Sequence, residues 1–133
     1  MNFKSFLKNH IVVLDGAMGT ELQNAGLALG ELPEEWNISR PDVIEGIHRA
    51  YFAAGADVVY TNTFGANSLK FGERTKEVVA AGVACALRAR GNGKNKLVAL
   101  DVGPTGKLLK PLGDLDFEAA VKIFGATISA GAA

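Results

Sequence analysis

The sequence predicts an α/β fold in which parallel strands alternate with helices. Three short apolar runs rich in β-branched residues are separated by segments with helical periodicity, and each run ends in a turn rich in glycine, asparagine or aspartate. Strands of parallel sheets are buried on both faces and read as continuous apolar runs. The repeated order of strand and helix therefore predicts a parallel sheet with right-handed crossovers.

The first predicted unit begins with the run Ile-Val-Val-Leu at residues 11–14. This run predicts a buried parallel strand, and Asp15 and Gly16 end it. Helical character follows over residues 18–27. Residues 28–38 have no clear period and are predicted to form a loop.

The second predicted unit starts with its helix. Ser39 is expected to cap the free N–H groups of this helix, Pro41 suits its first turn, and Asp42 faces the positive end of the helix dipole. Gly55 is a suitable residue just beyond the end of the helix. A second strand is predicted at once, over residues 58–61.

The third predicted unit contains a helix over residues 74–90, a strand over 97–100 and a last helix over 116–129. The segment Ala-Gly-Ala at 130–132 repeats the one that precedes the second strand, so a further strand is expected directly after Ala133. Three units do not close a barrel, and an open sheet of three strands has two unprotected edges. The sequence is thus interpreted as cut off, with residues 1–133 forming an incomplete domain.

Composition excludes several classes of protein. The 133 residues carry 14 acidic and 14 basic side chains, and this zero net charge argues against a dedicated nucleic-acid binder. The basic excess around residues 70–96 is interpreted as a solvated helix face. The single cysteine excludes an internal disulfide framework and a multi-cysteine zinc site built from this chain alone. No apolar run spans a membrane and no signal peptide is recognised, so a cytoplasmic protein is expected.

Three polar strand ends are the candidate site, because ligands of parallel α/β folds bind beyond the carboxyl ends of the strands. These segments are 15–20, 61–65 and 101–106, and all contain glycine. The Asp15 carboxylate could hold a ligand ammonium group, or it could merely cap the turn after the strand. Asp101 could form another wall of the site or a tight loop.

Three other features are interpreted as structural. The turn over residues 16–19 lacks the glycine spacing of a dinucleotide site and has no phosphate-binding lysine. Cys85 lies in the middle of a predicted helix among apolar residues, which favours a buried core thiol over a nucleophile. His48 lies on an apolar helix face without a second ligand at metal-binding spacing.

Taken together, the strand ends resemble one family. The segments 14–21, 36–44, 48–51, 54–59, 61–66 and 101–106 resemble, in order and in register, the homocysteine S-methyltransferase domain. The similarity extends from about residue 11 to 133 and is greatest to the homocysteine-binding domains of cobalamin-dependent methionine synthases.

This resemblance implies a (β/α)8 TIM barrel that transfers a methyl group to the sulfur of homocysteine and so yields methionine. It also implies a zinc ion, held by three cysteines, that lowers the pKa of the homocysteine thiol. The matching positions place Asp15 and Gly16 against the amino-acid part of homocysteine, and Thr63 in the wall of the same pocket.

The chain departs from the family pattern where the zinc ligands are expected. The family's Asn-Cys and Cys-Cys-Gly elements are absent, and Cys85 matches neither of them. We therefore expect that this chain forms the first three units of the barrel and is inactive alone. Zinc is expected in the full-length protein, and cobalamin and methyltetrahydrofolate are possible cofactors on further domains. The resemblance leaves the methyl donor open. The alternative is a non-catalytic half-barrel that self-associates or pairs with a complementary chain.

Overall fold

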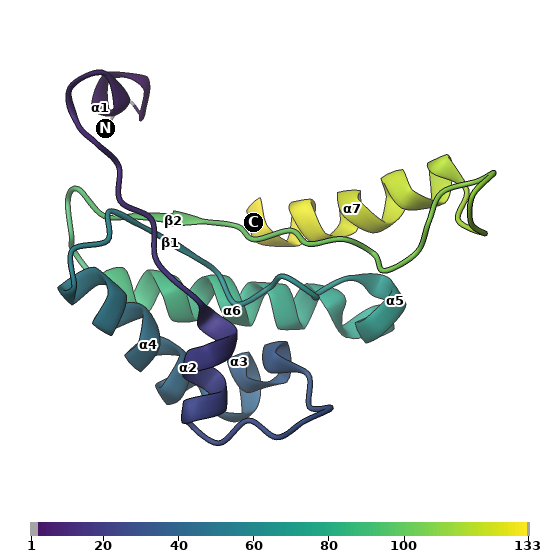
Figure 1. Ribbon diagram of the computed structural model, residues 1–133, viewed down its shortest axis with the longest axis horizontal. Helices are drawn as coiled ribbons and strands as arrows, with labels where there is room; N and C mark the ends of the chain where they lie inside the picture. The colour runs from purple at the N-terminus through teal and green to yellow at the C-terminus, as the bar shows by residue number, and fades with distance from the viewer. Residues whose placement is uncertain (1–2, 133) are drawn as a thin grey trace.

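A computed structural model describes residues 3–132 of the chain, and Figure 1 shows their arrangement. The elements follow one another in the order α1 (Phe3–Asn9), α2 (Met18–Asn24), η1 (Pro33–Glu35), α3 (Trp36–Ser39), α4 (Pro41–Ala53), β1 (Val58–Tyr60), α5 (Ser68–Phe71), η2 (Gly72–Arg74), α6 (Thr75–Arg90), β2 (Leu97–Ala99) and α7 (Phe117–Ala132). The predicted α/β class is confirmed.

The sheet is small and parallel, as the alternation of elements predicts. β1 pairs with β2 in the register Val58 to Leu97, and Leu14 forms an isolated parallel bridge to Val58 on the other side of β1. β1 therefore lies between the segment around Leu14 and β2. The carboxyl ends of all three segments consequently face the same way.

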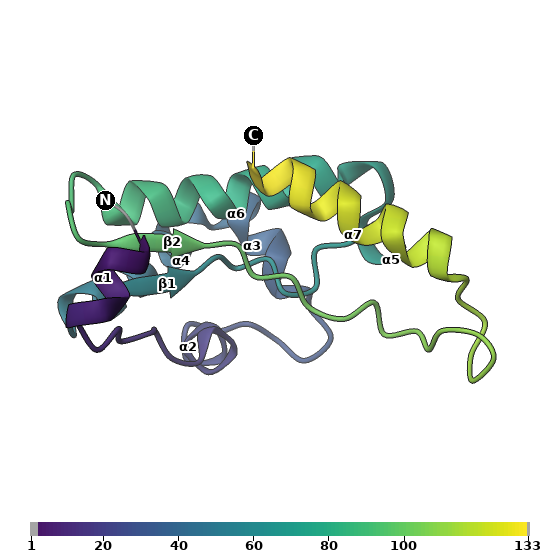
Figure 2. The same cartoon turned by 90° about the horizontal axis from the view of Figure 1, so that it is seen from above.

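Helices cover one face of this sheet. α4 packs against β1, α6 packs against β2, and the two helices pack against each other. Viewed from above, α6 lies on one side of the strands and α2 on the other (Figure 2). α7 packs against α6, so the long connection after β2 returns the chain to the same helical layer.

The core consists of two clusters of buried apolar side chains, and α6 contributes to both. The first joins α2, α3, α4 and α6, and the second joins α5, α6 and α7. Their buried members are Leu22, Trp36, Ile44, Ile47 and Cys85 in the first cluster and Ala66, Phe71, Val78, Val79 and Ala130 in the second. Burial of each large member stabilises the fold by about 1.5–3 kcal/mol. The core thus fixes the helices that hold the strand ends in place.

The predicted strand at residues 11–14 is only partly confirmed. The Val13 carbonyl accepts hydrogen bonds from the N–H groups of Asp57 and Val58, but the parallel bridge is confined to Leu14. The expected burial is wrong, since Ile11 is 88% exposed and Val13 is 50% exposed. The physical reason is that, within residues 3–132, β1 pairs with one edge of this segment and no strand pairs with its other edge.

The predicted loop at 28–38 contains two short helices, η1 and α3. Elements of three and four residues are too short to show a helical period, although Pro33 occupies the favoured first position of η1. The predicted cap of α4 is also wrong. Ser39 ends α3 and donates its hydroxyl proton to the Glu35 carbonyl, while α4 begins at Pro41 without a side-chain cap.

The remaining boundaries agree with the predictions to within a few residues, including α6, β2 and α7. Pro41 occupies the first turn of α4 and Gly55, with a φ of 112°, follows the end of this helix, as predicted. None of the helices in the described part of the chain is both long and apolar enough to cross a bilayer.

Candidate functional site

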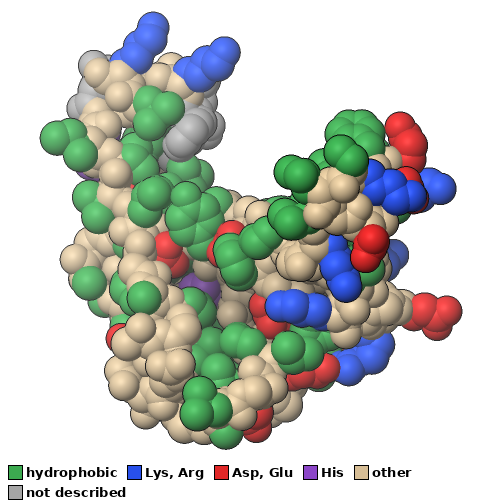
Figure 3. Space-filling model, turned by 45° about the vertical axis from the view of Figure 1, so that its right-hand side comes forward, with side chains coloured by type: hydrophobic (Ala, Val, Ile, Leu, Met, Phe, Trp, Pro, Cys, Tyr) green, Lys and Arg blue, Asp and Glu red, His purple; other side chains and the backbone are tan. Residues whose placement is uncertain are grey.

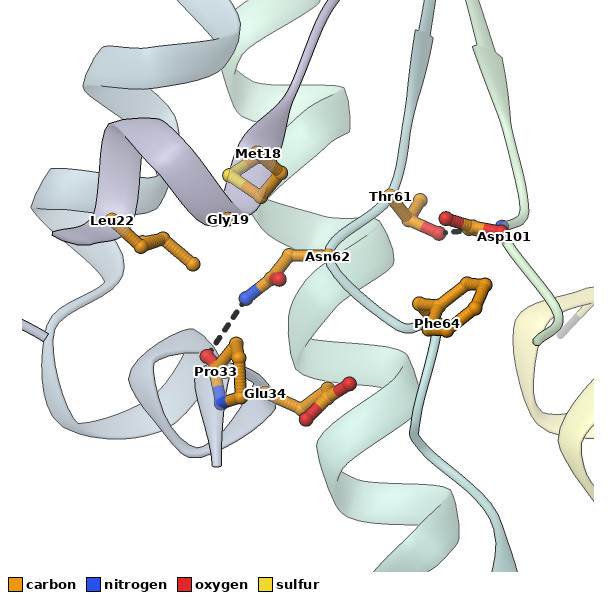
Figure 4. Close-up of a pocket in the computed structure, with 9 residues that line it drawn as sticks. All are labelled: Met18, Gly19, Leu22, Pro33, Glu34, Thr61, Asn62, Phe64 and Asp101. Atoms are coloured by element: carbon orange, nitrogen blue, oxygen red, sulfur yellow. Dashed lines mark hydrogen bonds between the residues drawn. The ribbon is translucent and has the colours of Figure 1, made fainter. Parts of the chain in front are cut away.

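A cavity of about 280 Å³ opens at the carboxyl ends of the strands (Figure 4). This volume is close to the lower end of the usual range for small-molecule sites, about 300–1,000 Å³. The cavity lies between the start of α2, the helix η1 and the segments that follow β1 and β2. Its lining residues are Met18, Gly19, Leu22, Pro33, Glu34, Thr61, Asn62, Phe64 and Asp101.

A closed ring of hydrogen bonds ties the ends of β1 and β2 together. The Asp101 N–H donates to Thr61 Oγ1 at 3.0 Å, and Thr63 Oγ1 donates to the Asp101 carbonyl at 2.7 Å. The two threonine hydroxyl oxygens are 2.6 Å apart, and the Thr63 proton is already used, so Thr61 is the donor between them. This ring fixes the backbone of Asp101, whose side chain lines the cavity (Figure 4).

Two buried asparagines attach η1 to the end of β1. Asn37 Nδ2 donates to the Asn62 carbonyl at 2.8 Å, and Asn62 Nδ2 donates to Asn37 Oδ1 at 2.9 Å. Asn62 Nδ2 also donates to the Pro33 carbonyl at 2.9 Å. Buried amides that are satisfied in this way hold a single arrangement, so Glu34, the residue after Pro33, has a fixed position in the cavity wall.

Glu34 is the most deeply buried acidic residue of the site. Its residue surface is 4% exposed, and its Oε1 accepts a hydrogen bond from the Gly65 N–H at 2.5 Å. Its Oε2 is also buried but has no hydrogen-bond partner among the described residues. The cavity wall therefore contains a carboxylate that is anchored through one oxygen and unsatisfied at the other.

The pKa values of Asp15 and Asp101 are both raised by the surroundings of the cavity. Burial raises the pKa of Asp15 above its ordinary value, against the lowering effect of the hydrogen bond that Tyr60 N–H donates to Oδ2 at 3.0 Å. The charge of Asp101 raises the pKa of Asp15 further. Burial, followed by the charge of Glu34, raises the pKa of Asp101. Asp101 thus lies close enough to both Asp15 and Glu34 for their charges to repel, which favours a cationic ligand group.

The structure places the residues predicted for the site in different roles. Asp15 lies beside the cavity residue Asp101, within range of its charge. Gly16 packs closely against Tyr51, as shown by the 3.0 Å that would separate a Cβ at position 16 from the phenol oxygen. Thr63 has no exposed surface and its hydroxyl is used within the hydrogen-bonded ring, so it positions Asp101 instead of facing the cavity.

Sequence reasoning missed Glu34 as a cavity residue. Glu34 lies in the segment predicted as a loop, and its burial follows from the contact between η1 and the strand end. A charged residue next to a proline in an aperiodic segment gives no signal of such burial. Phe64 is part of the second polar strand end that the sequence did identify.

The residues present here do not fit the zinc site that the family resemblance implies. Within the described part of the chain, no three histidine, cysteine or acidic side chains come together as metal ligands. Cys85 is fully buried, with its sulfur next to the Asn37 carbonyl and the Arg88 guanidinium, and burial raises its pKa. This is the environment of a core thiol, as the sequence predicted.

The strand order and the acidic cavity define a class: a parallel α/β protein with a cavity of small-molecule size at the carboxyl ends of its strands, where such folds bind ligands. Comparison with known families is specific, since the profile of the homocysteine S-methyltransferase family matches residues 12–133. The chain belongs to the homocysteine S-methyltransferase family.

Curated and solved relatives agree with this membership. The chain is 40% identical over 117 residues to the methionine synthase of Mycobacterium tuberculosis, covering 77% of this chain and 10% of that protein. It is 51% identical over 73 residues to the methionine synthase of Mycobacterium leprae, covering 50% of this chain and 6% of that protein. The crystal structure of the Escherichia coli homocysteine methyltransferase MmuM, in its oxidized form, superposes with a TM-score of 0.82 at 25% identity.

The matches cover most of this chain but only part of each relative. The superposition on the oxidized form covers 98% of this chain and 52% of MmuM, and the metallated form gives a TM-score of 0.80 with 52% of MmuM covered. The chain thus spans about half the length of the solved relative, and a tenth or less of the curated methionine synthases.

Proposed function

We propose that this chain is the homocysteine-binding part of a homocysteine S-methyltransferase of the methionine synthase type. In the whole protein, a methyl group is transferred to the sulfur of homocysteine and methionine is formed. The chain contributes the first three units of a (β/α)8 barrel, and the reaction takes place in the cytoplasm. The observation that carries this proposal is the acidic cavity at the strand ends of a chain that belongs to this family.

The chemistry of the cavity suits the amino-acid part of homocysteine. The ammonium group of an amino acid is a charged donor that forms strong hydrogen bonds with carboxylates in a partly buried site. Asp15, Gly16 and Thr63 serve this binding in the proposal, with Asp15 as the direct partner of the substrate and Thr63 as a residue that holds Asp101 in place.

Thiolate activation and the methyl donor are assigned to residues and domains outside these 133 residues. Zinc would lower the pKa of the homocysteine thiol there, and cobalamin and methyltetrahydrofolate are the candidate methyl carriers. The chain alone is therefore expected to bind homocysteine without transferring a methyl group to it.

A second candidate function is a non-catalytic half-barrel that works by pairing with another copy or with a complementary chain. The exposed segment at Ile11 and Val13 favours this candidate, because its edge that is unpaired within residues 3–132 could accept a further strand. The two functions differ in a simple observation, since only the first requires that homocysteine binds to the cavity.

The substitution Asp15→Asn tests the proposed function. It keeps the acceptor for the Tyr60 N–H but removes the charge, so we expect L-homocysteine to bind about tenfold more weakly or worse. Isothermal titration of the 133-residue chain with L-homocysteine measures the change.

The matched control is Asp114→Asn, which removes a charge from an exposed position outside the cavity and should leave the affinity unchanged. Equal affinity of the Asp15 variant and the wild type would show that Asp15 does not hold the substrate. If the wild-type chain bound no homocysteine at all, the proposed function itself would be wrong.

A further inference from the structure

The cavity at the strand ends has an unbalanced negative charge. Its lining, as far as the chain is described, includes Glu34 and Asp101 but no lysine or arginine. Asp15 adds a third carboxylate that interacts with Asp101 through its charge. An occupant with a positive charge would reduce the repulsion among all three groups.

Glu34 is the group that gains most from such an occupant. A buried acceptor that lacks a partner destabilises a fold by about 1–3 kcal/mol, and by more when it is charged. Glu34 Oε2 is in this state among the described residues, whereas Oε1 is satisfied by the Gly65 N–H. The carboxylate cannot turn toward water without breaking the hydrogen bond that Gly65 N–H donates to Oε1.

Lys70 lies near Glu34 but forms no ion pair with it among the described residues. Lys70 Nζ and Glu34 Oε1 both lie close to Gly65, each 2.7 Å from the position that a Cβ of this glycine would take. The ion pairs found within residues 3–132 do not include one between these two side chains, and Lys70 is exposed. Lys70 therefore does not supply a hydrogen-bond partner for Glu34 Oε2.

The neighbouring glutamate shows that the burial of Glu34 is specific. Glu35 is not among the residues that line the cavity, and it forms an ion pair with Arg74 at 2.8 Å, where its side chain is 37% exposed. Glu34, in contrast, is directed to the strand ends by the hydrogen bond between Asn62 and the carbonyl of Pro33 (Figure 4). This fixed position reduces the entropy that a ligand must overcome to use the carboxylate.

We infer that Glu34, together with Asp101, selects ligands that carry an ammonium group at this cavity. Glu34 is thus a specificity residue in addition to Asp15, and its free Oε2 accepts a hydrogen bond from the ligand nitrogen. The identity of the ligand as an α-amino acid rests on the proposed function, but the requirement for a cationic group does not.

The test compares three ligands by isothermal titration. L-Homocysteine has the ammonium group and the thiol, L-2-aminobutyrate keeps the ammonium group without the thiol, and 4-mercaptobutanoate keeps the thiol without the ammonium group. Each is titrated into the wild-type chain, into Glu34→Gln and into the control Glu35→Gln. The amide oxygen introduced by Glu34→Gln can still accept the Gly65 N–H, so the fold should be retained, and thermal unfolding checks this.

We expect the Glu34 variant to bind L-homocysteine and L-2-aminobutyrate about 10- to 100-fold more weakly, with 4-mercaptobutanoate unchanged. The Glu35 variant should bind all three ligands as the wild type does. If Glu34→Gln did not fold, Asp101→Asn would replace it, and the same loss of affinity is expected for the two ligands that carry an ammonium group. The wild type is expected to bind L-homocysteine more tightly than 4-mercaptobutanoate.

The outcomes separate this inference from the proposed function. Undiminished binding of L-homocysteine to the Glu34 variant overturns the inference and leaves the proposed function standing; a water molecule would then satisfy Oε2. Binding of L-2-aminobutyrate that depends on Glu34, without binding of homocysteine, supports the inference and refutes the proposed function. Absence of binding for every ligand refutes both.

Discussion

His48 shows at the scale of one residue how burial changes chemistry. The side chain has no exposed surface, and neither ring nitrogen has a hydrogen-bond partner among the described residues. Burial disfavours the charged imidazolium and lowers the pKa of His48 from 6.5 to about 4. The residue is therefore neutral in the folded chain at neutral pH, in keeping with the structural role that the sequence predicted.

This pKa difference predicts that the chain loses stability as the pH falls below 6.5. Between pH 6.5 and about 4 the unfolded chain binds a proton at His48 and the folded chain does not, so acid favours unfolding. The free energy of unfolding should fall by about 3 kcal/mol across this window, and urea titrations at a series of pH values measure it.

Two variants isolate the contribution of His48 from that of the carboxylates. The side chain introduced by His48→Leu cannot be protonated, and the free energy of unfolding of this variant should decrease less over the same window. His10→Gln changes the other histidine, which is exposed and bonded to Asp57, and should retain most of the loss. An equally steep decrease for the His48→Leu variant would exclude His48 as its cause.

At the scale of an element, α6 is held against the strand ends by the absence of a side chain. Gly82 is buried in α6, and a Cβ at this position would lie 2.7 Å from both Asn37 Nδ2 and Thr63 Cγ2. Contacts of this length do not occur in relaxed structures, so a larger residue must displace the asparagine or the threonine. Both belong to the hydrogen-bond networks that shape the cavity.

Gly82→Ala is therefore expected to destabilise the chain by about 1–3 kcal/mol, although alanine is the better helix former. The control is Gly125→Ala in α7, because a Cβ at this position would meet nothing within 4 Å. This substitution should stabilise the chain by about 0.5–1 kcal/mol. Urea unfolding measures both variants. Stabilisation by both substitutions would mean that α6 does not contact the strand ends as closely as described.

At the scale of the whole molecule, the concave face of the chain is rich in exposed apolar side chains. Figure 3 shows hydrophobic side chains on both sides of this hollow, with acidic side chains between them. The segment at Ile11 and Val13 is exposed and has one edge unpaired within the described residues, and Tyr60 at the end of β1 is 40% exposed. Exposed edges and large apolar patches favour association.

We accordingly predict that the chain self-associates as its concentration increases. Sedimentation velocity should give an average mass that rises with concentration, and Ile11→Lys combined with Val13→Lys should reduce the rise, because charges on an edge strand oppose pairing. Leu29→Lys is the control, since Leu29 is 99% exposed but lies in the connection after α2. A monomer at all concentrations would contradict the predicted association.

The sequence by itself determined the class of the fold and two of the strand-end segments that line the cavity. Apolar runs and helical periods are local, so they predicted β1, β2, α4, α6 and α7 and the strand-end segments that begin at Thr61 and Asp101. Burial of Cys85 and His48 followed from their places on apolar helix faces. The order of the matching segments along the chain also indicated the correct family.

Only the tertiary structure decided which side chains form the cavity and in which state. The burial of Glu34 depends on hydrogen bonds between segments 25 or more residues apart, as in the contact of Asn62 with Asn37, and no local pattern encodes such a contact. For the same reason Thr63 is a buried member of a hydrogen-bonded ring and residues 11–14 are exposed. Burial and pairing are set by what packs against a residue, which its sequence neighbours do not specify.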